Sequence, residues 1–208
     1  MEEFKVILWD FDGVIMDSMP IRGKGFEEVL KEYPNEQVSQ LMQFHEQNGG
    51  LSRYVKFRYF FEEIRKESIT EAQVLGLAES FSKIMFQLLL DEKLLIADSV
   101  KFIKENYSDY EMHVVSGSDG KELRAICEGL KLAQYFKTIN GSPTPKKELV
   151  ASLIDHNKYN RDEIVLIGDS INDFEAAVEN GISFVGYNNP TLGNKSGYIN
   201  KFADFKKN

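Results

Sequence analysis

The chain has 208 residues, of which 42% are hydrophobic and 28% are charged. These values are ordinary for a globular protein, so they exclude a disordered or fibrous chain, and the length suffices for a sizeable hydrophobic core. The formal net charge of -8 argues against nucleic acid as a partner, because that binding depends on Lys and Arg replacing the counterions of the phosphates.

Cys127 is the single cysteine of the sequence, which excludes an intrachain disulfide and a multi-cysteine zinc site. We therefore expect a reducing compartment, with the cytoplasm as the default location. The apolar run near the N-terminus has only four residues, 6–9, which is too short for a signal or membrane-spanning segment. We expect no association with a membrane.

The first predicted element is a buried strand at residues 6–9, which ends at the polar turn of residues 10–13. The following stretch, 16–90, lacks convincing strands and shows helical spacing instead. Its apolar stripes are Phe57, Phe60, Phe61 and Ile64, and Leu77, Phe81, Ile84, Met85 and Leu88. We interpret these stripes as helix-packing faces of an inserted, smaller all-α domain.

Beyond residue 90, short apolar runs alternate with helical patterns. The runs at 112–115, 164–167 and 182–185 predict strands, and the apolar spacing before and between them predicts helices. Such alternation favours a parallel sheet with helices on both faces. The predicted fold class is therefore α/β, with a Rossmann-like parallel sheet core formed by residues 1–15 and 91–208 and a helical cap at 16–90.

Polar side chains that suit phosphate chemistry stand in four places, all at or just beyond predicted strand ends. They are Asp10, Asp12 and Gly13; Ser116 and Gly117; a lysine near position 146; and Gly168, Asp169 and Asp173. In open α/β sheets that edge surrounds a ligand-binding crevice. We therefore expect one site there.

These residue types fit the transfer of a phosphoryl group. Asp10 and Asp169 would repel each other across a shared cavity unless a hard cation lay between them, and carboxylate oxygens suit Mg²⁺. Asp12 could protonate a leaving alcohol and then deprotonate water, as a positioned carboxyl group does in general acid–base catalysis. Ser116 and nearby backbone N–H groups could hold the phosphate oxygens.

The sequence resembles the haloacid dehalogenase superfamily, specifically its phosphatase-type members with a helical cap inserted after the first motif. Asp10, Asp12, Gly13 and Val14 match the family's first motif, Asp-x-Asp-Gly-Val. Ser116 falls at the second motif, and residues 168–173 match the acidic Gly-Asp-x-x-x-Asp pattern. The resemblance covers essentially the whole core.

This resemblance implies roles for the matched residues. Asp10 is expected to be the nucleophile and a metal ligand, and Asp12 the general acid and base as well as a ligand through its backbone carbonyl. Asp169 is expected to bind the metal, and Asp173 to support it directly or through water.

The family also needs one lysine, and this sequence offers Lys146 and Lys147. The resemblance favours Lys146, because family members with a Gly-Ser-Pro opening, here residues 141–143, tend to place the lysine three residues after the proline, although Lys147 stays open. A lysine at the start of a helix would bind phosphate and offset the carboxylates.

Two basic side chains of the predicted cap are candidates for binding the non-reacting part of a substrate. Arg53 and Lys56 follow Gly49 and Gly50, which permit a tight backbone approach, and Ser52, a predicted N-cap. Solvent-exposed positions on a charged helix are the alternative reading.

The resulting hypothesis is a Mg²⁺-dependent phosphohydrolase that cleaves a small phosphorylated metabolite through an aspartyl-phosphate. A phosphosugar mutase of the β-phosphoglucomutase type is one alternative, and a catalytically idle binding module on the same fold is another. The sequence names neither the substrate nor the oligomeric state.

Overall fold

The computed structural model describes residues 4–195 and 197–205, and at their centre lies a parallel sheet of six strands. The strand order is β3-β2-β1-β4-β5-β6. The strands are β1 (Val6–Trp9), β2 (Glu111–Asp119), β3 (Thr138–Ser142), β4 (Ile164–Gly168), β5 (Ser183–Tyr187) and β6 (Gly197–Ile199). This is the order of the Rossmann-type sheet, whose direction of winding reverses between β1 and β4. The predicted fold class is confirmed.

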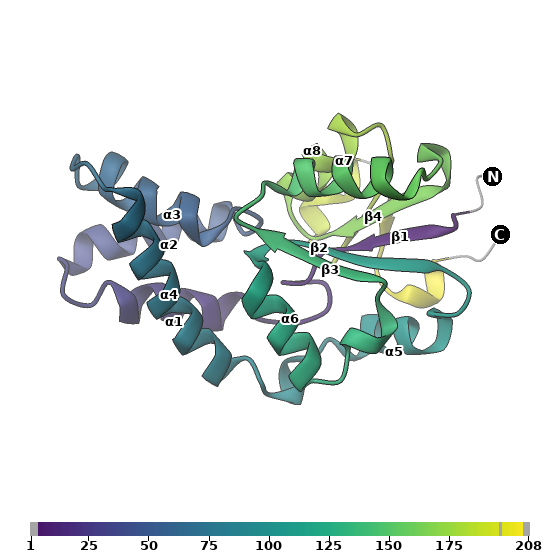
Figure 1. Ribbon diagram of the computed structural model, residues 1–208, viewed down its shortest axis with the longest axis horizontal. Helices are drawn as coiled ribbons and strands as arrows, with labels where there is room; N and C mark the ends of the chain where they lie inside the picture. Colours follow the sequence, from purple (N-terminus) through teal and green to yellow (C-terminus); the bar gives the residue numbers. More distant parts are fainter. Residues whose placement is uncertain (1–3, 196, 206–208) are drawn as a thin grey trace.

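Helices cover both faces of the sheet (Figure 1), because alternate residues of each central strand point to opposite sides. Val6 and Leu8 pack into the hydrophobic cluster that includes α7 (Lys146–Asn157) and α8 (Ile171–Glu179). Ile7 and Trp9 pack into the other cluster, with α5 (Ala97–Asn106) and α6 (Gly120–Gly129). A strand that is buried on both faces needs apolar side chains on successive residues, and residues 6–9 form such a run.

The strand predictions at 6–9, 112–115, 164–167 and 182–185 coincide with β1, β2, β4 and β5, although β2 extends further. Strands β3 and β6 were not predicted from the sequence. They are the two edge strands, and β3 contains a single apolar residue, Ile139. Because an edge strand is only partly buried, its hydrophobic signal is weak.

The helical stretch lies at one end of the sheet (Figure 1). It contains α1 (Met19–Val29), α2 (Asn35–Gln47), α3 (Arg53–Tyr59), a π-helix (Phe60–Ile64) and α4 (Glu71–Leu88). Ser52 caps α3 as predicted, since its hydroxyl accepts from the backbone N–H of Val55 at 3.4 Å. The predicted stripes are largely buried, but Leu88 is 43% exposed.

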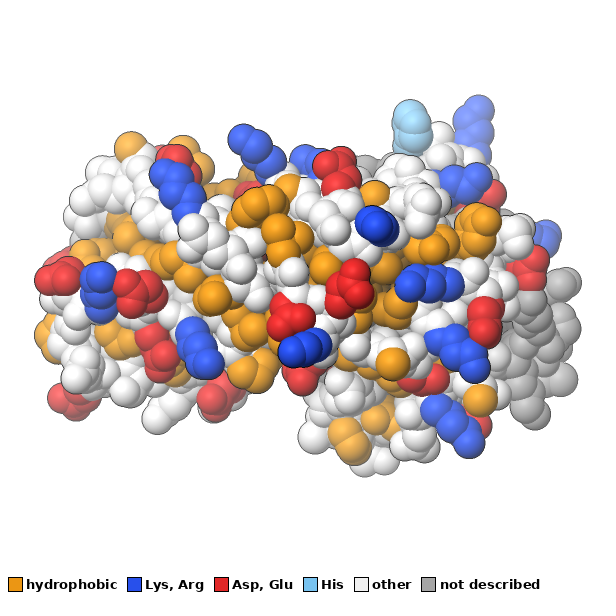
Figure 2. Space-filling model, turned by 90° about the horizontal axis from the view of Figure 1, so that it is seen from below, with side chains coloured by type: hydrophobic (Ala, Val, Ile, Leu, Met, Phe, Trp, Pro, Cys, Tyr) orange, Lys and Arg blue, Asp and Glu red, His pale blue; other side chains and the backbone are white. Residues whose placement is uncertain are grey.

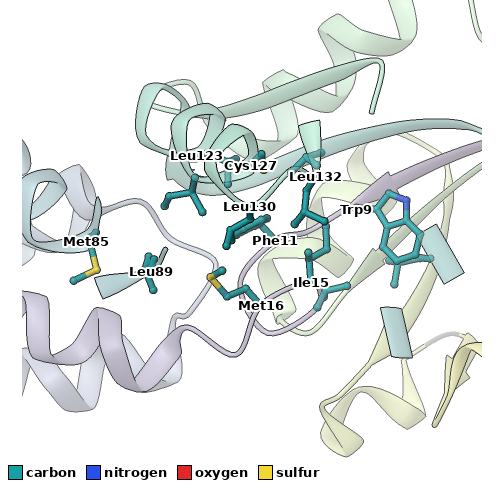
Figure 3. Close-up of a cluster of buried hydrophobic side chains, with 14 of the residues drawn as sticks. Trp9, Phe11, Ile15, Met16, Met85, Leu89, Leu123, Cys127, Leu130 and Leu132 are labelled. Carbon is teal, nitrogen blue, oxygen red and sulfur yellow. The ribbon is translucent and has the colours of Figure 1, made fainter. Parts of the chain in front are cut away.

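The two chain segments that join this stretch to the sheet run side by side. The N–H of Asp17 donates to the carbonyl of Leu94 at 2.8 Å, and that of Ile96 donates to Ile15 at 2.9 Å. Buried side chains continue across the junction, from Met85 and Leu89 past Met16 to the sheet (Figure 3). The helical stretch therefore packs on the core through a continuous hydrophobic contact. Its boundaries as a separate domain, 16–90, stay a prediction.

Trp9, Cys127 and His113 are buried in the core. The ring nitrogens of His113 lie 2.8 Å from Thr138 Oγ1 and 3.0 Å from the Tyr159 hydroxyl. These contacts explain why a histidine can stand inside an apolar strand.

The surface drawn in Figure 2 shows basic, acidic and apolar side chains interspersed, without a broad basic area. Within the residues that the structure describes, no helix is both long and apolar enough to cross a bilayer.

Candidate active site

The sheet brings the sequence motifs to one edge. Strands β2, β1 and β4 are parallel neighbours, so their carboxyl ends lie together and carry Ser116, Asp10 and Asp169 to the same place. Lys146 begins α7, which follows β3 on the other side of β2. The motifs therefore surround the point where the sheet reverses its winding, a position at which such folds bind ligands.

Three carboxylates form the centre of the site. Asp10, Asp169 and Asp173 each offer an oxygen, and these oxygens lie within 4.8 Å of one another. Gly13 makes room for them, because its φ of +77° suits glycine and a Cβ there would stand 1.9 Å from Asp169 Oδ2. The first motif therefore needs glycine for both conformation and space.

Lys146 provides positive charge to this group. Its Nζ lies 2.9 Å from Asp10 Oδ1 and also contacts Asp173 Oδ1. The other oxygen of Asp173 accepts from Ser170, from the backbone N–H at 3.0 Å and from the hydroxyl at 2.6 Å. Lys147, by contrast, is exposed and pairs with Glu179 at 3.2 Å. Both lysines line the cleft at this edge, but of the two it is Lys146 that contacts the carboxylates.

The carboxylates are short of compensating charge. Burial and the charge of Asp173 raise the pKa of Asp10 to about 7, although Lys146 opposes the change. Burial and the charges of Asp10 and Asp173 raise the pKa of Asp169 to about 8. The carboxylates outweigh the burial of Lys146 and raise its pKa above the usual value. Three clustered carboxylates with one ammonium suit a divalent cation with oxygen ligands, so the residues present fit Mg²⁺.

Asp12 points its carboxylate into a different set of contacts. Oδ1 accepts from the Ser18 hydroxyl and from Arg22 Nε at 2.6 Å, and Oδ2 accepts from the Ser118 hydroxyl. Burial alone would raise the pKa of Asp12, but Arg22 and the two hydroxyls outweigh it and lower the pKa. The metal role predicted for Asp12 concerns its backbone carbonyl and stays a prediction.

Arg53 and Lys56 lie in places that the sequence did not indicate, because both are buried rather than solvated. Arg53 donates from Nη1 to Glu122 Oε2 at 2.7 Å and from Nη2 to Oε1 at 2.8 Å. Lys56 Nζ lies 2.9 Å from His45 Nδ1 and donates to the Gly49 carbonyl at 3.2 Å. Burial lowers the pKa of Lys56 to about 7. Their role in substrate binding stays a prediction.

The glycine pair between α2 and α3 closes tightly over the motif loops. A Cβ on Gly117 would lie 2.2 Å from the Gly50 carbonyl oxygen, and one on Gly50 would lie 2.7 Å from Ser170 Oγ. Beside this contact is a cleft of about 270 Å³, lined by residues that include Ser52, Gly117, Ser142, Lys146 and Asn172. The predicted close approach of Gly49 and Gly50 is therefore present at Gly50.

Ser116 is buried, and its hydroxyl accepts from the Ser118 N–H at 3.1 Å.

Comparison with known proteins agrees with this geometry. The family of haloacid dehalogenase-like hydrolases matches residues 7–187 of the chain. The chain belongs to this family. No curated protein matches the sequence.

Solved structures that resemble this haloacid dehalogenase-like hydrolase share its fold at low sequence identity. A predicted phosphoglycolate phosphatase from Haemophilus somnus has 19% identity and a TM-score of 0.74, covering 99% of this chain and 97% of its own. A β-phosphoglucomutase from Clostridium difficile has 15% identity and a TM-score of 0.77, covering 98% and 93%. The hydrolase YfnB from Bacillus subtilis, described as bound to magnesium, has 17% identity and a TM-score of 0.71, covering 98% and 97%.

Sequence reasoning missed three polar residues next to the hydrolase motifs: Arg22, Ser118 and Glu122. Ser118 could have been found, since it stands two residues after Ser116. Arg22 and Glu122 each precede a buried apolar residue of their helix by four positions, Phe26 and Ile126. A charge on a buried stripe is a signal that a partner lies opposite, although it does not name the partner.

Proposed function

We propose that this protein is a Mg²⁺-dependent phosphatase that cleaves a small phosphate monoester through an aspartyl-phosphate on Asp10. The observation that carries the proposal is the buried Asp10 carboxylate beside Lys146, within the group of Asp10, Asp169 and Asp173. Membership of the haloacid dehalogenase-like hydrolases supports it. The single cysteine supports a cytoplasmic location.

In the proposed reaction an Asp10 oxygen attacks the phosphorus atom, and the bond from phosphorus to the leaving oxygen breaks. Asp12, which must carry a proton when the anionic ester is bound, gives it to that oxygen. It then takes a proton from the water that attacks the phosphoenzyme, which releases phosphate and restores Asp10. Lys146, Ser116 and the backbone at Gly117 hold the phosphate oxygens. Mg²⁺, held by Asp10, Asp169, Asp173 and the Asp12 carbonyl, would offset the negative charges of nucleophile and phosphate.

The helical stretch 16–90 acts as a cap in this proposal, because its Gly50 carbonyl already packs on Gly117 at the site. Closure would exclude bulk water during the reaction. Arg53 and Lys56 are proposed to bind an anionic or hydroxylated part of the metabolite. For Arg53 this requires an exchange of the Glu122 carboxylate for the substrate, since both guanidinium Nη atoms donate to Glu122.

The first test is release of inorganic phosphate from p-nitrophenyl phosphate with Mg²⁺ and with EDTA. A screen of phosphorylated sugars, phosphoglycolate, nucleotides and phosphorylated cofactors follows. We expect phosphate release with Mg²⁺ and none with EDTA. Failure to release phosphate from any ester would contradict the proposal and favour an idle binding module.

A phosphosugar mutase is the second candidate, because a solved β-phosphoglucomutase has the same fold and its reaction would use the same pair of aspartates. A mutase returns the phosphoryl group to a sugar hydroxyl and releases little phosphate. Stoichiometric phosphate release from the best sugar phosphate supports the phosphatase, whereas isomerised sugar phosphate supports the mutase.

A further inference from the structure

Four buried charged side chains form a series of alternating sign between the sheet and the helical stretch. The order is Asp12, Arg22, Glu122 and Arg53, and we call this series the charge chain. Arg22 joins its two carboxylates through Nε, 2.6 Å from Asp12 Oδ1, and Nη1, 3.0 Å from Glu122 Oε1. None of the four residues is more than 9% exposed.

Glu122 is the residue on which both arginines converge. It lies in the first turn of α6, whereas Arg22 is in α1 and Arg53 in α3. Its Oε1 accepts from Arg22 and from Arg53 Nη2, and its Oε2 accepts from Arg53 Nη1 at 2.7 Å. Arg53 is fixed in turn by the Ser82 hydroxyl at 2.7 Å and by the Phe81 ring, 4.4 Å from its guanidinium carbon.

This arrangement restricts Arg22. A guanidinium held at Nε and Nη1 by two different carboxylates has a fixed plane, because both hydrogen bonds must keep their direction. Its third nitrogen, Nη2, is buried without a hydrogen-bond partner among residues 4–195 and 197–205, so Asp12 and Glu122 are the groups that orient the guanidinium. Without Glu122, Arg22 would keep a contact at one nitrogen and could turn about it.

We propose that Glu122 is a positioning residue of the active site, which acts through Arg22 to hold the Asp12 carboxylate. The proposal rests on the proposed function in one respect, the role of Asp12 as general acid. Glu122 itself does not touch the substrate. The effect of removing it should therefore appear where proton donation to the leaving group matters.

The kinetic test compares two esters in the full-length protein with Mg²⁺. p-Nitrophenolate leaves readily without a proton, whereas the alkoxide of glycerol 2-phosphate does not. Glu122→Gln should lower kcat/KM about tenfold for glycerol 2-phosphate and less than about twofold for p-nitrophenyl phosphate, since general acid catalysis typically contributes larger factors than these. Glu128→Gln is the matched control, because Glu128 is an exposed glutamate of the same helix.

A double-mutant cycle tests whether the effect passes through Arg22. Adding Glu122→Gln to Arg22→Met should cause no further selective loss with glycerol 2-phosphate. Equal losses for both esters, or additive losses in the cycle, would overturn the proposal. If Glu122→Gln does not fold, Glu122→Asp keeps the buried negative charge but withdraws the carboxylate from Arg22, and it carries the same expectation.

A second readout does not depend on activity. In ¹⁵N-labelled protein, exchange of the Arg22 Nε–H with water should be at least about tenfold faster in Glu122→Gln than in the parent or in Glu128→Gln, because the bond to Asp12 opens more often. Unchanged exchange would overturn the positioning role. Should no ester be hydrolysed, the phosphatase proposal fails and this exchange measurement decides the role of Glu122 alone.

Discussion

Two buried charged regions meet at the first motif, and they are organised in opposite ways. Asp10, Asp169 and Asp173 share the ammonium of Lys146, and we call these four residues the acidic cluster. The charge chain instead balances two carboxylates with two guanidinium groups. Asp10 and Asp12 stand two residues apart and are both buried, yet the pKa of Asp10 is raised and that of Asp12 is lowered. Burial alone therefore does not decide ionisation; the charge of the neighbours does.

The difference in charge balance indicates different roles for the two regions, ligand binding for one and the fixing of side-chain geometry for the other. The acidic cluster is short of positive charge, which suits a site that takes up a cation and then a phosphate ester. The charge chain is already neutral and occupies all its carboxylate oxygens, which suits a contact that fixes geometry. The following experiments test this contrast, starting with the largest expected effect.

Replacing the nucleophile should disable the acidic cluster most severely. Asp10→Asn should lower turnover at least about a thousandfold, because a neutral amide neither attacks phosphorus nor binds the metal well. A single turnover in ¹⁸O-water followed by peptide mass spectrometry tests the same step. Label should enter the Asp10 carboxylate; its absence there would contradict the aspartyl-phosphate.

Removing the metal should affect the acidic cluster alone. Chelation should lower turnover by at least about a hundredfold, and Ca²⁺ should support less activity than Mg²⁺, since its looser coordination suits in-line attack poorly. Calorimetric titration should show weaker Mg²⁺ binding to Asp169→Ala but not to Glu122→Gln. Equal loss of affinity in both variants would mean that the two regions do not act separately.

Substitution of each lysine tests which of the two acts in the acidic cluster. Lys146→Met should lower kcat/KM about a hundredfold, because it removes the cation that contacts Asp10 and Asp173, as expected for a lost charge-stabilising donor. Lys147→Met should have little effect, since its exposed pair with Glu179 contributes little. Steady-state kinetics decides between them, and a larger loss in Lys147→Met would reverse the assignment.

Substitution of Arg53 tests whether the charge chain also binds the substrate. If Arg53 leaves Glu122 to bind the metabolite, Arg53→Ala should lower kcat/KM about tenfold more for the best metabolite than for ethyl phosphate, an alkyl ester that offers Arg53 nothing to bind, as expected for one charge-assisted contact. Equal losses for these two alkyl esters would assign Arg53 to positioning alone.

The pH dependence of stability should show the smallest effect and opposite signs in the two regions. Without metal, the pKa values of Asp10 and Asp169, about 7 and about 8, exceed the usual 3.8, so the folded protein binds extra protons in that window. Unfolding free energy should therefore fall as pH rises from 4 to 8. Asp12, whose pKa is lowered, contributes stability above its usual pKa that is lost as pH falls.

Urea unfolding at a series of pH values measures this dependence. Asp169→Asn should reduce the decline between pH 4 and pH 8, and Mg²⁺ should stabilise the protein more at pH 8 than at pH 5, because it favours the ionised carboxylates. A decline that is unchanged in Asp169→Asn would show that it originates elsewhere.

Much of this hydrolase could be predicted because its signals are local. The run at 6–9 is apolar on successive residues since β1 is covered on both faces, and Asp10, Ser116 and Asp169 follow strands whose ends meet at one edge. Lys146 was favoured from its spacing, and the fold places it beside Asp10. The edge strands β3 and β6 lacked such a signal because burial imposes less on an edge.

The sequence by itself determined the fold class and the motif positions, since these follow from local periodicity and spacing. Only the tertiary structure decided which charges meet. Arg22 and Glu122 are 100 residues apart, and Arg53 and Glu122 are 69 apart. Helical spacing places each of them on a buried face, but three helices must pack before their opposite charges come into contact. Arg53 and Lys56 lie buried against Glu122 and His45, contacts that their helical spacing does not indicate, and their role in substrate binding stays a prediction.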